Sequence, residues 1–213
     1  MVLSSKTLIL TRKGMFMNFT VIDFETANSK RASACALGIV KVVDGVVVEK
    51  DAWLIRPDDM RFDGMNIAIH GIRPEQVIDE PEFDELYQLV FKEKLENQLV
   101  IAHNASFDMS VLRKSLDLYG IDYPSFDYLC SVKVAQKTWP DLINHKLDSM
   151  SRFLNFKFKH HDALDDCLAC ANVIIKACEE NQVDSPLKLA DKLKMQKGRV
   201  FKGGYRACSV NKR

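Results

Sequence analysis

The sequence predicts a mixed α/β fold in which helices cover the faces of a β-sheet. Three short apolar, β-branched runs come first, at residues 19–24, 34–43 and 46–55. Segments with helical periodicity follow, with one more apolar run among them. Strands first, and then helices alternating with a strand, is the order typical of such a sheet. With 213 residues, 47% of them hydrophobic and 28% charged, the chain suits one globular domain with a tail.

The first strands are expected to form an antiparallel hairpin. Asp44-Gly45 separates the second run from the third, and Asp-Gly between two such runs is a strong signal for a two-residue turn. A fourth strand is expected at residues 99–102. The chain should therefore build an antiparallel pair before its first long helix.

Helices are expected where apolar residues recur at helical spacing, over residues 82–96, 106–119, 147–154 and 162–179. A shorter helix is expected after Ser185-Pro186, because proline fits the first helical turn. Gly198 is the expected stop of that helix. These elements divide the chain into an N-terminal extension over residues 1–17, one domain over residues 18–180 and a tail over residues 181–213.

Charge is distributed unevenly along the chain. The total is +1, but residues 187–213 carry nine Lys/Arg and only one acid, which gives this tail +8 and leaves −7 for the rest. A body rich in acids with a basic appendage suits a protein that holds metal ions and touches phosphates from the side. The alternative is that the tail is a solvated helix with a frayed end. Met15 and Met17 are alternative start residues within the extension.

The six cysteines lack the dense spacing of a secreted disulfide scaffold, so we expect reduced thiols in a cytoplasmic protein. Cys167 and Cys170 form a CxxC pair near two histidines, but no second pair completes the four ligands of a structural zinc site. The apolar runs are too short for a membrane span, which needs about 20 residues. Residues 1–16 do not have the pattern of a signal peptide.

Two carboxylates are expected to point the same way at the end of the first strand. Strand alternation places Asp23 and Glu25 on one face and Ile22 and Phe24 on the other. Like charges this close favour a cation between them. The alternative is an exposed edge with two solvated acids.

Asp108 falls within the apolar face of the helix expected over residues 106–119. A buried carboxylate without a partner is costly, so a metal ion, an arginine or a helix amide must compensate it. The alternative is that Asp108 only favours the positive end of that helix.

A third acidic cluster runs into the helix expected over residues 162–179. On the helical wheel, Asp165 points away from the apolar stripe, and Asp162 is placed to cap the helix. Asp166 lies at the edge of the stripe, which makes it the ligand candidate. His161 precedes the helix on a loop and can accept a proton as a neutral imidazole, whereas His160 is expected to be an ordinary surface residue.

Acids from one strand and two helices form the arrangement needed to hold two Mg²⁺ ions about 4 Å apart over a scissile phosphate. The motifs that carry them are Asp23-Phe24-Glu25-Thr26, His103-Asn104-Ala105-Ser106-Phe107-Asp108, and His161 with Asp166 five residues on. In this order they resemble the three motifs of the DEDDh superfamily of 3′→5′ exonucleases, which includes the epsilon subunit of bacterial DNA polymerase III. The resemblance spans roughly residues 18–180.

The resemblance implies a ribonuclease H-like fold, with a mixed five-stranded sheet flanked by helices. It implies hydrolysis from a 3′-OH end with release of 5′-monophosphates, on single-stranded DNA or RNA 3′ ends, and a DNA polymerase as a candidate partner. By it, two Mg²⁺ or Mn²⁺ ions are held by four carboxylates: Asp23, Glu25, Asp108 and Asp166. His161 would deprotonate the attacking water, while Thr26, His103 and Phe107 would border the terminal nucleotide.

Two further hypotheses remain open from sequence. The first is an RNA-trimming exonuclease of the same fold, because recognition of a 2′-OH needs only one or two groups near the sugar. The second is a non-catalytic module that binds nucleic acid or a polymerase, although all five expected catalytic positions are filled.

Overall fold

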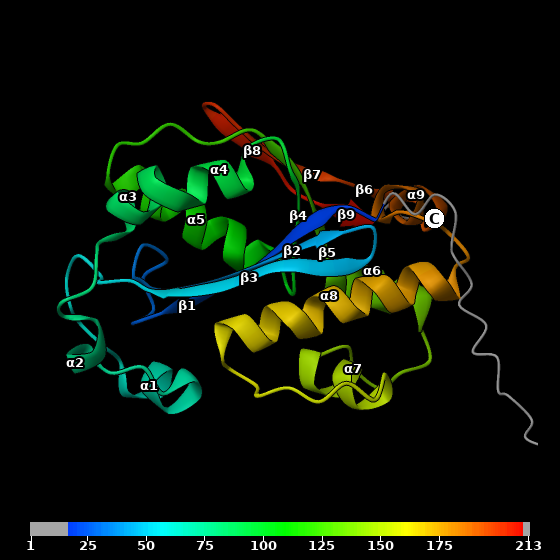
Figure 1. Ribbon diagram of the computed structural model, residues 1–213, viewed down its shortest axis with the longest axis horizontal. Coiled ribbons are helices and arrows are strands. Elements are labelled where there is room, and N and C mark those ends of the chain that lie inside the picture. The colour runs from blue at the N-terminus through cyan, green and yellow to red at the C-terminus, as the bar shows by residue number, and fades with distance from the viewer. Residues whose placement is uncertain (1–16, 211–213) are drawn as a thin grey trace, which may run out of the picture.

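The computed structural model describes residues 17–210 of the chain, so most of the expected N-terminal extension, Met15 included, lies outside the described residues. One seven-stranded sheet forms the centre of the protein, with strand order β3-β2-β1-β4-β5-β7-β8 (Figure 1). Its strands are β1 (Phe19–Thr26), β2 (Ala34–Val43), β3 (Val46–Leu54), β4 (Leu99–Ala102), β5 (Phe126–Cys130), β7 (Gly198–Phe201) and β8 (Gly204–Arg206). A separate two-stranded sheet pairs β6 (Met195–Gln196) with β9 (Ser209–Val210).

The predicted α/β class and the first four strands are confirmed. β1, β2 and β3 are antiparallel neighbours, while β1, β4 and β5 run parallel. Asp44 and Gly45 both adopt positive φ angles, 50° and 80°, as expected of a two-residue turn between β2 and β3. The parallel order brings the carboxyl ends of β1, β4 and β5 to the same edge of the sheet.

Helices cover both faces of the sheet (Figure 1). They are α1 (Gly64–His70), α2 (Pro74–Val77), α3 (Phe83–Leu86), α4 (Lys92–Leu95), α5 (Ser106–Leu118), α6 (Ser131–Thr138), α7 (Leu147–Phe153), α8 (Ala163–Glu180) and α9 (Pro186–Lys192). The long helix α8 and α6 lie on one face, and α3, α4 and α5 lie on the other. A π-helical turn, η1 (Tyr87–Phe91), joins α3 to α4, so the helix predicted over residues 82–96 is one continuous helical segment with an irregular middle.

The C-terminal region differs from the prediction. The sheet has two strands more than the five predicted, because β7 pairs with β5 and β8 pairs with β7. Gly198 does not stop the helix α9, which ends at Lys192, but begins β7 instead. A Cβ at Gly198 would lie 2.2 Å from the ring of Tyr128, so the glycine is needed for the close approach of β7 to β5.

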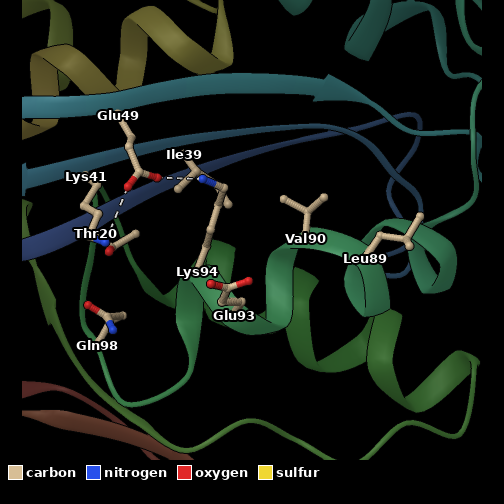
Figure 2. Close-up of a pocket in the computed structure, with 9 residues that line it drawn as sticks. All are labelled: Thr20, Ile39, Lys41, Glu49, Leu89, Val90, Glu93, Lys94 and Gln98. Atoms are coloured by element: carbon tan, nitrogen blue, oxygen red, sulfur yellow. Dashed lines mark hydrogen bonds and ion pairs between the residues drawn. The ribbon is translucent and has the colours of Figure 1, made fainter.

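Ion pairs attach the outer strand β3 to the helical layer beside it. A small cavity of about 170 Å³ lies between the sheet and η1–α4, and none of the predicted site residues lines it. Figure 2 shows Glu49 between two lysines there, 3.5 Å from Lys41 Nζ and 2.8 Å from Lys94 Nζ. These pairs are partly exposed, so each contributes at most about 1 kcal/mol. Within residues 17–210, no helix has both the length and the apolar character needed to cross a membrane.

Candidate active site

Four carboxylates from three elements meet at the carboxyl edge of the parallel strands. Asp23 and Glu25 come from β1, Asp108 from α5 and Asp166 from α8, and all four line one cavity of about 480 Å³. Carboxylate oxygens of Asp23, Glu25 and Asp166 lie within 4.8 Å of one another. The structure therefore brings together the four acids that the sequence motifs predict.

Strand alternation places the first two acids, as expected. Ile22 and Phe24 are buried in the core, while Asp23 and Glu25 are only partly buried and face the cavity. Asp23 pairs across the sheet with Gly38 of β2. A Cβ at Gly38 would lie 2.3 Å from the carbonyl oxygen of Ala163, so this glycine lets the start of α8 rest directly on the sheet beside Asp23.

Asp108 is buried, with an exposed fraction of 1%, which confirms its expected place on the apolar face of α5. Its Oδ1 accepts a hydrogen bond from the backbone N–H of Phe24, at 3.0 Å. Its Oδ2 is also buried and has no hydrogen-bond partner among the described residues. Burial raises the pKa of Asp108 to about 7, although the Phe24 amide and the nearby Arg31 act in the opposite direction.

The start of α8 distinguishes its three acids as the helical wheel predicts. Asp162 caps the helix, because its side chain accepts from the N–H of Asp165 at 3.3 Å. The side chain of Asp165 accepts from the N–H of Lys159 at 2.8 Å, and it does not line the cavity. Asp166 faces the cavity with an exposed fraction of 5%, and its Oδ2 accepts from the backbone N–H of His161 at 3.2 Å.

Two histidines, not one, lie at this acid. His161 lines the cavity and adopts a positive φ of 64°, a strained backbone conformation of the kind found at functional sites. Its ring stacks on the ring of His160 with centroids 3.8 Å apart. The expectation that His160 is an ordinary surface residue is wrong, because its Nδ1 lies 3.2 Å from Oδ1 of Asp166 and the residue lines the cavity.

Mutual repulsion and burial make the acidic cluster costly without a cation. Burial raises the pKa of Asp23 well above its usual value, and the charges of Asp108, Asp166 and Glu25 raise it further. Burial, and after it the charges of Asp166, Asp108 and Asp162, raises the pKa of Glu25 to about 8. Burial also raises the pKa of Asp166. Hard oxygen ligands at this spacing are what Mg²⁺ or Mn²⁺ prefers. A buried Asp108 Oδ2 without a partner also fits a site that takes a cation or its water.

Two of the three residues expected around the terminal nucleotide line the cavity, and the third does not. His103 and Phe107 line the cavity. The Nδ1 of His103 lies 2.7 Å from the Ser131 hydroxyl, and burial lowers the pKa of His103 to about 4, so the ring is neutral. Thr26 is buried beside the cavity rather than in its wall, and Asn66 donates to its carbonyl and hydroxyl oxygens at 2.7 and 3.2 Å. Its contact with a nucleotide stays a prediction.

Part of the cavity wall was not expected from sequence. Val132 and Gln136 come from α6, while His145 and Lys146 precede α7. None of them belongs to a recognisable motif, and α6 itself was not predicted, so only the fold brings them to the site. An irregular loop such as that before α7 carries no periodic signal in the sequence.

The CxxC pair does not form a zinc site in the part of the chain that the structure describes. Cys167 is buried, with its Sγ 3.2 Å from the carbonyl oxygen of Gly38. Cys170 is buried, with its Sγ 3.3 Å from the Ser131 hydroxyl. Both thiols pack α8 onto the core, and the groups that could hold a metal ion contain only histidines and carboxylates.

Comparison with known proteins agrees with this geometry. The family model RNase_T, described as exonuclease, matches residues 20–174. The chain belongs to this exonuclease family. It is a 3′→5′ exonuclease of the DEDDh type, and hence a metal-dependent phosphodiester hydrolase with a ribonuclease H-like fold. The alternative of a non-catalytic binding module is not supported.

The curated proteins similar to this exonuclease are much longer than the chain itself. It is 25% identical over 191 residues to the PolC-type DNA polymerase III of Bacillus cereus and 32% identical over 167 residues to that of Thermotoga petrophila. These matches cover 87% and 76% of the chain but only 13% and 12% of the polymerases, so the chain spans about an eighth of their length.

Solved structures share the fold. A structure of exonuclease X in complex with 5′-overhanging duplex DNA is 25% identical, with a TM-score of 0.66, and the match covers 81% of the chain and 97% of exonuclease X. The nuclease domain of 3′hExo, a DEDDh family member bound to rAMP, is 16% identical, with a TM-score of 0.65 and coverage of 78% and 93%. That second likeness shows the fold alone.

Proposed function

We propose that this exonuclease removes nucleotides one at a time from the 3′ end of DNA, at single-stranded or frayed ends, and releases 5′-mononucleotides. The observation that carries the proposal is the cluster of Asp23, Glu25 and Asp166, whose oxygens lie within 4.8 Å in a cavity that also contains Asp108 and His161. The wall of the cavity includes Phe107, an aromatic ring suited to contact with a nucleotide.

The four carboxylates would hold two Mg²⁺ or Mn²⁺ ions. Asp23, Glu25 and Asp166 supply the close group of oxygens, and the unpaired Oδ2 of Asp108 completes the set. When bound, such ions neutralise the phosphate, lower the pKa of water and stabilise the leaving oxygen. Without cations the acids repel one another, as their raised pKa values indicate.

His161 would act as the general base for the attacking water. Burial, and after it the charge of His160, lowers the pKa of His161, so its ring is neutral at pH 7 and can accept a proton. The backbone N–H of His161 donates to Asp166, which fixes the end of the loop before α8 relative to the acids. His160 would hold the other oxygen of Asp166 in place.

DNA is the proposed substrate because relatives with at least 25% identity include PolC-type DNA polymerases and an exonuclease bound to DNA. A DNA polymerase is the corresponding candidate partner. We place the enzyme in the cytoplasm, since its six cysteines are free, buried thiols in the part of the chain that the structure describes.

Matched oligonucleotides test the reaction and its substrate. Single-stranded DNA, duplex DNA and RNA of the same sequence, labelled at either end, are incubated with Mg²⁺, with Mn²⁺ or with EDTA. We expect a 3′ label to leave as a mononucleotide before the rest of the strand shortens, with DNA degraded faster than RNA and no reaction in EDTA. Asp23→Ala should abolish the activity.

Three outcomes bear on separate parts of the proposal. Late release of the 3′ label would disprove the polarity. Faster degradation of RNA would transfer the proposal to an RNA-trimming enzyme of the same fold. Full activity in EDTA, or in Asp23→Ala, would exclude the carboxylate cluster as the place of the reaction.

A further inference from the structure

Arg31 is a cation at the rim of the active-site cavity with no place in the mechanism described above. It lies in the connection between β1 and β2, and its side chain is exposed. Its guanidinium carbon lies 4.4 Å from the centre of the ring of Phe107, which lines the cavity. Within residues 17–210, no acid forms an ion pair with Arg31. It therefore carries a free positive charge beside the expected path of a polyanion.

The connection that carries Arg31 is held by many hydrogen bonds. Asn28 donates to the carbonyl oxygen of Arg61 at 2.6 Å, and its own N–H donates to the hydroxyl of Ser33. The N–H of Ala27 donates to the carbonyl oxygen of Ser33 at 2.8 Å, which closes the loop. The backbone on both sides of Arg31 is thus fixed relative to β1, so little further ordering is needed for the guanidinium to act.

The stacked arrangement leaves the donors of Arg31 available. A guanidinium that lies over an aromatic ring uses its face for that contact and keeps its N–H groups, which point outward in its plane, free. Those groups match two oxygens of a phosphate, which lysine cannot engage in the same fork-like way. The charge of Arg31 also acts on Asp108, since it lowers the pKa of that carboxyl. Phe107 directly precedes Asp108 in α5, so a guanidinium stacked on the Phe107 ring lies near the acids and can contact the same substrate strand.

We propose that Arg31 binds a phosphodiester of the substrate strand upstream of the scissile one and so positions the 3′ end over the carboxylates. The proposal rests on the proposed function. It assigns to Phe107 a second task, since its ring holds the guanidinium at the rim. Arg31 would act on substrate binding rather than on the chemical step.

Lys30 provides a matched control in the same connection. Its Nζ lies 2.6 Å from Asp59 Oδ2, so its charge is already paired. Arg31→Ala and Lys30→Ala each remove one exposed cation from neighbouring positions. We expect Arg31→Ala to raise KM about tenfold with kcat little changed, the size expected for one charge-assisted hydrogen-bonded contact. Lys30→Ala should leave both parameters unchanged, and Arg31→Lys should fall between them.

Neutral linkages identify the contact directly. A set of 5′-fluorescein DNA strands carries one methylphosphonate in place of one of the three linkages upstream of the scissile phosphodiester. Binding of each strand to the unmodified chain and to Arg31→Ala is measured by fluorescence anisotropy in the presence of Ca²⁺. A gel checks that the strands stay intact during the measurement. We expect one linkage at which the methylphosphonate weakens binding about tenfold in the unmodified chain and has no effect in Arg31→Ala.

The proposal is overturned if no linkage shows this coupling, or if Lys30→Ala weakens binding as much as Arg31→Ala does. A failure of the proposed function looks different. In that case the strands are not shortened with Mg²⁺, whereas the binding measurement still reports on Arg31. Shortening without any coupling would remove the role of Arg31 alone.

Discussion

Asp108 combines burial, a single hydrogen bond and a second oxygen without a partner. When this carboxylate is ionised, it destabilises the metal-free protein. We therefore expect its role to lie in the active site rather than in the stability of the fold. Asp108→Asn keeps an oxygen for the N–H of Phe24 and removes the charge. We therefore expect the metal-free variant to be more stable at pH 8, by about 1–3 kcal/mol, and its exonuclease activity to fall at least about a hundredfold.

Urea unfolding in EDTA and the mononucleotide-release assay measure the two effects of Asp108→Asn. Asp108→Ala is the control, since it also removes the acceptor for Phe24 and should not stabilise the protein to the same extent. A variant that is less stable and fully active would show that Asp108 is an ordinary structural residue.

The two histidines can be distinguished by their effect on rate. His161→Ala should lower kcat about 10²–10⁴-fold, the range for loss of a general base, with metal binding largely intact. His160→Ala should have a smaller effect, because it removes only one contact to Asp166. The pH dependence of kcat is measured for both variants, and only His161→Ala should lose its acidic limb. The reverse order of effects would assign the base to His160.

At the scale of whole elements, the site depends on how closely α8 approaches the sheet. Gly38 of β2 pairs with Asp23, and the first residue of α8 lies against it. Gly38→Ala places a Cβ 2.3 Å from the Ala163 carbonyl oxygen, so α8 must shift away from β1 and take Asp166 with it. We expect a loss of about 1–3 kcal/mol in stability and a steep fall in activity.

Gly64→Ala is the matched control for Gly38→Ala. Gly64 begins α1, and a Cβ there would meet no atom within 4 Å, so the same substitution should leave stability and activity nearly unchanged or slightly raise stability. Urea unfolding and the release assay report both quantities. Normal activity in a destabilised Gly38→Ala would show that the position of α8 does not control the site.

The sequence predicts the elements that have a clear apolar periodicity within their own residues. It does not predict the elements whose position depends on contacts with distant parts of the chain. β1, β2, β4, α5 and α8 have clear apolar patterns, and three of these elements, β1, α5 and α8, carry the four acids. β5 and α6 were not predicted, although Tyr128 and Leu129 of β5 are buried in the core. β5 has only five residues, and β7 covers its outer edge from a distant part of the chain. Arg31, Lys146 and His160 reach the site through loops, which sequence periodicity does not place.

At the scale of the whole molecule, the acidic cluster links stability to pH. Glu25 and Asp108 have folded-state pKa values of about 8 and about 7, above their usual values of 4.5 and 3.8. Raised values mean that the protonated forms favour folding, so this contribution is complete below about pH 4 and is lost as pH rises to about 8. Metal-free protein should therefore melt at a lower temperature at pH 8 than at pH 6.

Mg²⁺ should reverse that loss, since it binds the folded acids and replaces their protons. Thermal melting of EDTA-treated protein, with and without added Mg²⁺, measures the effect. The rise in Tm on addition of Mg²⁺ should be larger at pH 8 than at pH 6, and Asp108→Asn should reduce it. An equal rise at both pH values would contradict a site built from these carboxylates.

The C-terminal segment that follows Glu180 was expected to be a tail outside the domain, and its contacts test that division. Four of its seven cations within the described residues pair with acids: Lys188 with Asp184, Lys197 and Arg199 with Asp127, and Lys202 with Asp122. The segment also completes the sheet, since Val200 of β7 is buried. Cys208 is buried as well, and its N–H donates to the hydroxyl of Tyr128. These contacts suit a structural part of the domain better than a free arm for phosphates.

Truncation after Glu180 therefore tests the folding of the domain as well as the binding of DNA. It removes β7 from β5 and exposes Phe126 and Tyr128, each of which is 3% exposed in the intact chain. At about 1.5–3 kcal/mol for each large apolar side chain uncovered, we expect a loss of several kcal/mol, measured by urea unfolding. Lys194→Ala with Arg206→Ala is the control, because neither cation pairs with a described acid. A stable truncated chain with weaker, less salt-dependent DNA binding would instead identify the segment as a phosphate-binding arm.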